Sequence, residues 1–156
     1  MEQVESRSLS KWFVTGFGVG YCPIAPGTMG TVLGLLLFLP FHTAPLLYVL
    51  PALVALFGIG VYTTGFSFAI FGKKDPSKVV IDEIVAILFT LFLLPSSAVL
   101  WVFGFLLFRF FDIAKPIGVR EAERLPGGLG IMADDIIAAL YTLLIIWPVH
   151  YLIALS

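Results

Sequence analysis

Five acidic residues lie in or at the edge of strongly apolar stretches of the chain, where a negative charge is costly. They are Asp82, Glu83, Asp112, Asp134 and Asp135. A carboxylate within a bilayer-embedded helix costs about 2.5–3.5 kcal/mol on insertion scales, so each needs a cation, water or a metal ion. Carboxylates supply oxygen ligands, which suit Mg²⁺, Mn²⁺ or Ca²⁺ better than zinc or copper. The five residues therefore indicate a divalent-cation site.

Two basic residues flank Asp112 on its own helical face: Arg109 three positions before it and Lys115 three positions after it. A simple ion pair would explain this spacing. However, five ionised carboxylates with two cations give a local charge of about −3, which is repulsive beside a low-dielectric medium. A bound metal ion would relieve the repulsion and leave Arg109 and Lys115 to hold an anion, for which phosphate is the obvious candidate.

A simpler interpretation applies to the two acidic pairs. Asp82 with Glu83 and Asp134 with Asp135 are expected in the first turns of their helices, where the helix dipole favours acids that are merely solvated. Asp112 resists this interpretation because it comes at the carboxy-terminal end of its helix, where a negative charge opposes the dipole. It needs compensation.

The composition defines the class of protein that must position these residues. Of 156 residues, 60% are hydrophobic and 12% are charged, about half the charged fraction of a soluble domain. We expect an all-α, polytopic integral membrane protein forming a single domain over residues 1–156, with a polar segment at 1–11. The net charge of −1 argues against nucleic acid as a partner, and a single cysteine excludes an internal disulfide.

Proline and polar breaks divide the chain into about five hydrophobic helices. The apolar runs are Met29–Leu39, Leu46–Phe71, Val79–Leu94, Ala98–Phe111 and Ile131 to about Leu155. The first, third and fourth are shorter than the ~20 residues that usually span a bilayer. They are expected either to span with the help of flanking residues or to be re-entrant.

The cations indicate an orientation. If the five runs cross in turn, eight basic residues lie in loops on one side, which the positive-inside rule assigns to the cytoplasm. They are Arg7, Lys11, Lys73, Lys74, Lys78, Lys115, Arg120 and Arg124. The same threading brings the acidic clusters and the segment 26–30 to that side, whereas His42 and His150 lie on the other. We therefore expect an active site at the cytoplasmic membrane edge, without a histidine nucleophile.

Four blocks of the sequence resemble, in order and spacing, the phosphatidylglycerophosphatase A family. These blocks are Gly27-Thr28-Met29-Gly30, Asp82-Glu83, residues 108–116 (FRFFDIAKP) and residues 127–135 (GGLGIMADD). The resemblance implies a Mg²⁺-dependent lipid phosphatase of the bacterial inner membrane that converts phosphatidylglycerophosphate to phosphatidylglycerol in phospholipid biosynthesis. The family's motif positions fall on the five acids, on Arg109 and Lys115, and on Thr28. The glycine-rich loop 126–130 would add a helix amino terminus, a common anion site.

The expected mechanism is attack on phosphorus by a water that the metal ion activates, with the five acids as catalytic residues and metal ligands and with Arg109, Lys115 and Thr28 holding the phosphate. An aspartate nucleophile is the alternative. Three other functions stay open: an ion or proton pathway through intramembrane carboxylates, a lipid phosphotransferase, and a small structural membrane subunit. The sequence carries no signal for the number of metal ions, the acyl-chain preference or the oligomeric state.

Overall fold

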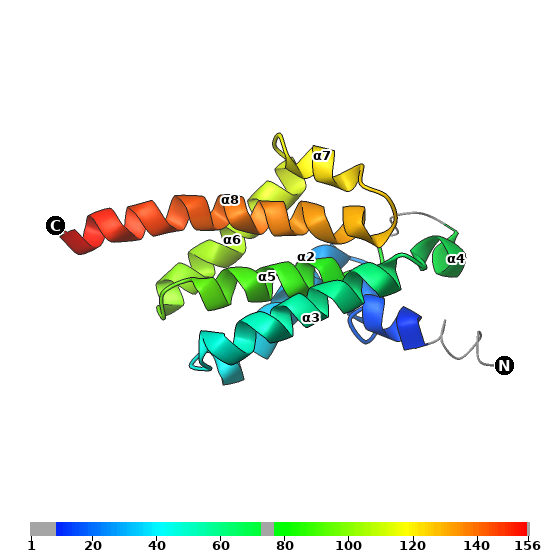
Figure 1. The fold of residues 1–156 in the computed structure, drawn as a ribbon, viewed down its shortest axis with the longest axis horizontal. Coiled ribbons are helices and arrows are strands. Elements are labelled where there is room, and N and C mark those ends of the chain that lie inside the picture. The colour runs from blue at the N-terminus through cyan, green and yellow to red at the C-terminus, as the bar shows by residue number, and fades with distance from the viewer. Residues whose placement is uncertain (1–8, 73–76, 156) are drawn as a thin grey trace.

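The structure is a computed structural model that describes residues 9–72 and 77–155, and over these ranges every regular element is a helix. The longer helices are α2 (Pro26–Phe38), α3 (Leu46–Thr64), α5 (Ile81–Leu93), α6 (Ala98–Ala114) and α8 (Gly128–Leu155). Short helices connect them: η1 (Val19–Tyr21), η2 (Leu39–Phe41), α4 (Ser67–Phe71) and α7 (Val119–Glu123). The long helices run back and forth, so α2, α5 and α8 begin near the end of the molecule where α3 and α6 finish (Figure 1).

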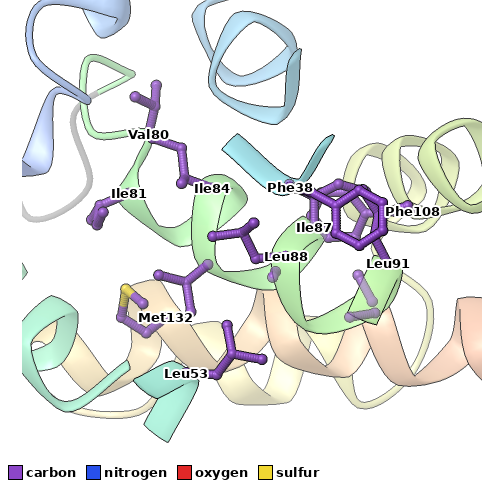
Figure 2. Close-up of a cluster of buried hydrophobic side chains, with 14 of the residues drawn as sticks. Phe38, Leu53, Val80, Ile81, Ile84, Ile87, Leu88, Leu91, Phe108 and Met132 are labelled. Atoms are coloured by element: carbon purple, nitrogen blue, oxygen red, sulfur yellow. The ribbon is translucent and has the colours of Figure 1, made fainter. Parts of the chain in front are cut away.

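Helix α5 is the centre of the fold and packs against α2, α3, α6 and α8. Asp82 and Glu83 occupy its first turn, where the helix dipole favours acids. The rest is apolar on nearly every face, and Ile84, Ile87 and Leu91 are among its buried side chains. Figure 2 shows these side chains between those of neighbouring helices. A helix covered on all sides holds the acids of its first turn in a fixed position relative to its neighbours.

Helices α6 and α8 meet α5 and bring the other charged residues to the same end. Helix α6 finishes at Ala114, and Lys115 takes a left-handed conformation (φ 44°) directly before Pro116. That conformation is costly for a residue other than glycine, and proline disfavours continuation of the helix. The chain therefore turns sharply at Lys115, immediately after the last turn of α6 that carries Asp112.

The longer helices correspond to the five predicted runs. Helix α2 begins at Pro26 rather than Met29, and α6 continues to Ala114 rather than Phe111. Three further differences concern the second run, the loop before the last helix and the start of that helix. The second run divides into α3 and α4 at residues 65–66. The loop 116–130 contains the unexpected helix α7. Helix α8 begins at Gly128 rather than at Ile131, which moves Asp134 and Asp135 out of the first turn and into the second. The alternative interpretation, in which this pair is merely solvated at a helix start, is therefore wrong, because both side chains are buried, at 5% and 3% exposed.

Among the described residues, α3 and α8 are long and apolar enough to cross a bilayer, and α2 with its η2 extension is a shorter apolar helix. Large apolar side chains are exposed along both long helices, including Leu47 and Val54 on α3 and Leu144 and Leu152 on α8. Exposed apolar surface of this kind is typical of contact with lipid. These features are consistent with the predicted membrane protein, although only two of the five segments meet the length criterion for a span.

Candidate active site

One end of the bundle contains a cavity of about 290 Å³. Its lining comes from the first turns of α2 and α5, the last two turns of α6, the first two turns of α8 and the segments that flank these helices. The residues are Ala25, Pro26, Gly27, Ser77, Val79, Asp82, Glu83, Arg109, Asp112, Lys115, Ile131, Asp134 and Asp135. The predicted convergence of the acidic clusters and their two cations on one place is thus confirmed.

Three of the carboxylates form a compact group. Asp82, Glu83 and Asp135 each offer an oxygen atom, and these oxygens lie within 4.8 Å of one another. Within the described structure, Oε2 of Glu83 and Oδ2 of Asp135 are buried without a hydrogen-bond partner. A buried carboxylate oxygen without a donor carries a large desolvation cost. This group therefore has the chemistry of a site for a hard cation, which its oxygen-only donors fit.

The other two carboxylates are ion-paired. Asp112 Oδ2 lies 2.5 Å from Nη1 of Arg109, three residues earlier on α6. The same Nη1 lies 3.7 Å from Oε1 of Glu83 and donates a hydrogen bond of 3.4 Å to Oγ1 of Thr31 on α2. Arg109 is 14% exposed. The guanidinium is therefore held at the edge of the carboxylate group by side chains of α2, α5 and its own helix, α6.

Lys115 forms the second ion pair. Its Nζ lies 2.9 Å from Oδ2 of Asp134 and 3.3 Å from Oε2 of Glu123 on α7. Partial burial by itself lowers the pKa of Lys115, but the hydrogen bond and the charge of Asp134, assisted by Glu123, outweigh it and raise this pKa above its ordinary value. Lys115 therefore stays protonated at any physiological pH.

The structure divides the predicted site residues into groups that the sequence did not separate. All five acids line the cavity, but only Asp82, Glu83 and Asp135 belong to the compact group. Both Asp82 and Glu83 line it, although adjacent residues of a helix point about 100° apart. Thr28 is not among the lining residues, and its neighbour Gly27 is.

The glycine-rich loop 126–130 has a packing role instead of lining the cavity. A Cβ atom on Gly128 would lie 2.0 Å from the carbonyl oxygen of Val61, and one on Gly130 would lie 2.5 Å from that of Leu125. These glycines therefore allow close contact of backbone with backbone at the start of α8. Nothing in the sequence alone distinguished this packing role from that of an anion site.

Three residues at or beside the site were not singled out individually. Gly27 and Ser77 line the cavity, and Thr31 contacts Arg109. The only signal for Gly27 was its place in the segment 26–30, which the threading brought to this end. Nothing in the sequence alone distinguished Thr31 from the other helical threonines.

A group of carboxylates beside two ion-paired cations, in a cavity at the end of an apolar helical bundle, fits an enzyme that acts on phosphate esters. Comparison with known proteins defines the enzyme further. The chain belongs to the phosphatidylglycerophosphatase A family, whose profile matches residues 12–150. It is accordingly a phosphatase that acts on a phosphomonoester.

Three bacterial relatives cover most of the chain. The phosphatidylglycerophosphatase A of Haemophilus influenzae is 37% identical over 87% of this chain and 85% of its own length. That of Escherichia coli is 39% identical over 79% of this chain and 73% of its own. A protein of Bacteroides thetaiotaomicron, provisionally named a phosphatidylinositol-3-phosphatase, is 39% identical over 89% and 92%. No solved structure matches the chain.

Proposed function

We propose that the chain hydrolyses phosphatidylglycerophosphate to phosphatidylglycerol and phosphate at a Mg²⁺-dependent site. The observation that carries this proposal is the cavity in which three close carboxylates adjoin Arg109 and Lys115. The family and two of its named members support the lipid substrate. The reaction belongs to phospholipid biosynthesis, and its product is a lipid that stays in the membrane.

Asp82, Glu83 and Asp135 would hold the Mg²⁺. Their oxygens are close together, and the buried oxygens of Glu83 and Asp135 without hydrogen-bond donors fit a cation. When bound, the ion would neutralise phosphate oxygens and make a water more acidic. Asp112 and Asp134 stand apart from this group because each pairs with a basic side chain. Their proposed role is to hold those side chains in place.

Arg109 and Lys115 would bind the phosphate group. The planar guanidinium of Arg109 can donate two parallel hydrogen bonds to phosphate oxygens, while the ammonium of Lys115 acts as a compact charge. Both side chains are held in place before substrate arrives. Arg109 contacts residues of α2, α5 and α6, and Lys115 contacts residues of α7 and α8. Donors fixed in advance stabilise developing charge without reorganising during the reaction.

In the proposed hydrolysis, a water oxygen bonds to phosphorus and loses a proton. The ester P–O bond breaks, and the glycerol oxygen leaves with the electron pair of that bond and takes up a proton in place of the one the water released. We favour water over an aspartate nucleophile because each of the five carboxylates already has a cation to hold or a place in the metal group. The departing alcohol is part of the lipid, so a site at the membrane edge would keep the acyl chains in the bilayer.

We further propose that the five long helices cross a bacterial inner membrane with the cavity facing the cytoplasm. Their alternating direction supports this (Figure 1). Of the eight cations behind the predicted orientation, Lys11, Lys78, Lys115, Arg120 and Arg124 fall in described segments outside these helices. Arg7, Lys73 and Lys74 lie outside the described residues. The distribution of cations carries the orientation through the positive-inside rule.

Phosphatidylinositol 3-phosphate is a second candidate substrate, because the relative from Bacteroides thetaiotaomicron has that specificity in its name. It is also a phosphomonoester on a membrane lipid, so the cations and carboxylates of the cavity could act on either. The two candidates differ in the alcohol that leaves, a small glycerol unit or a bulky inositol ring.

The test is phosphate release by the purified protein in detergent micelles that contain one lipid or the other. We expect release from phosphatidylglycerophosphate with Mg²⁺, none after chelation, and recovery when Mg²⁺ is restored. Faster release from phosphatidylinositol 3-phosphate would select the second candidate. Release from neither lipid, together with ion flux in reconstituted vesicles, would overturn the proposal in favour of an ion pathway.

A further inference from the structure

A hydrogen bond joins helix α2 to the guanidinium of Arg109 through the side chain of Thr31. This threonine is fully buried. Its Oγ1 donates a hydrogen bond of 2.9 Å to the carbonyl oxygen of Gly27 and accepts one of 3.4 Å from Nη1 of Arg109. Gly27 lines the cavity, so the chain of contacts runs from the wall of the cavity through Thr31 to Arg109.

The direction of these hydrogen bonds follows from the chemistry of a hydroxyl group. A threonine hydroxyl has one proton and two lone pairs. Because Thr31 gives its proton to Gly27, its oxygen is left to accept from the guanidinium. Nη1 also pairs with the carboxylates of Asp112 and Glu83, and Thr31 adds a neutral acceptor from α2.

This contact distinguishes Thr31 from other buried threonines. Thr90 on α5 and Thr142 on α8 are also fully buried and donate to the carbonyl oxygen four residues earlier, at 2.9 Å and 3.0 Å. A bond of this kind is ordinary for a threonine inside a helix. In the described structure, neither of these two hydroxyls has a hydrogen bond to a charged side chain. Thr31 does, and its partner lines the cavity.

We infer that Thr31 is a positioning residue that orients the guanidinium of Arg109 toward the phosphate of the substrate. The inference rests on the proposed function, in which Arg109 binds that phosphate. A guanidinium is a rigid planar fork, so fixing Nη1 against three helices also fixes the direction of its other nitrogens. Without the Thr31 acceptor, the two carboxylates would still attract Arg109 but would define its orientation less closely.

The test compares Thr31→Val, which removes the hydroxyl and keeps the shape of the side chain, with Thr90→Val as the matched control. We expect Thr31→Val to lower kcat/KM for phosphatidylglycerophosphate by about tenfold and to weaken inhibition by inorganic phosphate by a similar factor. Thr90→Val should stay within about twofold of wild type. Thr31→Ser, which keeps a hydroxyl at this position, should have a kcat/KM close to that of the wild type.

Further variants separate positioning from a general effect on folding. If Thr31 acts through Arg109, then Thr31→Val should cost little more in an Arg109→Lys background. Equal kcat/KM of Thr31→Val and Thr90→Val per folded molecule would overturn the inference. So would a full tenfold loss of kcat/KM when Thr31→Val is added to Arg109→Lys. If Thr31→Val cannot be recovered folded, Thr31→Ala removes the same hydroxyl without adding volume.

The proposed function can fail separately. If the wild-type protein does not hydrolyse the lipid, binding of inorganic phosphate in the presence of Mg²⁺, measured by titration calorimetry, still reports how the guanidinium holds an anion. Weaker binding by Thr31→Val than by Thr90→Val would then support the positioning role. Equal binding would overturn it.

Discussion

Lys115 Nζ lies 2.9 Å from Oδ2 of Asp134, and this contact joins the end of α6 to the second turn of α8. The left-handed conformation of Lys115 ends α6 at the point where the side chain reaches Asp134. Asp134 is 5% exposed, so without the ammonium its charge would be buried and uncompensated. The ion pair therefore stabilises the fold, and it also holds the ammonium group of Lys115 at the cavity.

Replacing Lys115 with methionine should destabilise the protein by about 1–3 kcal/mol, because it leaves Asp134 unpaired. Since the pKa of Lys115 is raised in the folded state, its contribution to stability is present below the ordinary pKa and is lost only as the pH rises through the higher folded value. The difference in thermal unfolding between wild type and Lys115→Met should thus persist from about pH 7 to about pH 10. Lys11→Met, at an exposed lysine near the Tyr21 ring, is the control. A difference that vanishes already near neutral pH would contradict this account.

The two groups of carboxylates should respond differently to Mg²⁺. Asp82→Asn, Glu83→Gln and Asp135→Asn should raise the Mg²⁺ concentration needed for half-maximal activity by about tenfold or more, since each removes a proposed ligand. Asp112→Asn and Asp134→Asn should mainly raise KM for the lipid, because they release Arg109 and Lys115. The measurement is a Mg²⁺ titration of each variant, with Glu121→Gln on α7 as the control outside the cavity. An unchanged Mg²⁺ requirement in all three of the first group would disprove the metal site.

Much of this arrangement could be predicted from the sequence because charged residues are rare in it. Each acid within an apolar run needs a partner, and helices that run back and forth place their ends together. Asp112 beside Arg109 followed from a spacing of three residues on one helix. The assignment of Asp134 to Lys115 did not, since it depends on the left-handed turn at Lys115 and on where α8 begins.

The glycines show where the sequence was insufficient. The second apolar run contains Gly58, Gly60 and Gly65, and glycine inside an apolar helix commonly permits a bend or close contact with another helix. In the structure, Gly60 permits close contact between helices, because a Cβ atom there would lie 2.6 Å from the side chain of Met132. A Cβ atom on Gly58 would meet nothing within 4 Å. Glycine marks a possible close approach in a sequence, but the partner that makes it necessary is set by tertiary packing.

Arg109 offers a test of whether the cation binds phosphate or only neutralises Asp112. If it only neutralises, Arg109→Lys should keep most activity, and the double change Arg109→Ala with Asp112→Ala should be milder than either single change. If it binds phosphate through its planar fork, Arg109→Lys should lower turnover strongly, and the double variant should be no better than the worse single. We expect the second result in the micelle assay. Rescue by the double change would leave Lys115 as the main phosphate-binding residue.

The proposed topology predicts opposite locations for two points of the chain. Reporter fusions after Gly72 and at the carboxy terminus should report the cytoplasm and the periplasm, respectively, because α5, α6 and α8 lie between them. Fusions that report the same side would contradict a crossing by each of these three helices. The geometry of the cavity would be unaffected, because it depends on which helix ends meet.

The closest steric constraint at the site is at Gly27, in the first turn of α2. A Cβ atom there would lie 2.1 Å from Oε1 of Glu83 and 3.2 Å from Nη2 of Arg109. Gly27→Ala would therefore displace Glu83 from the carboxylate group or push α2 away from α5. We expect it to lower turnover by about a hundredfold, comparable with the loss of a group that stabilises the transition state.

Gly58→Ala is the matched control for that substitution, because it places the same methyl group on an exposed part of α3 where nothing lies within 4 Å. It should keep wild-type turnover and Mg²⁺ requirement. If Gly27→Ala acts by displacing Glu83, adding Mg²⁺ should recover part of its activity, since a weakened site can be filled by mass action. Wild-type turnover in Gly27→Ala would show that Glu83 and α2 can move apart without cost, and that the close contact at Gly27 is not needed for the carboxylate group to work.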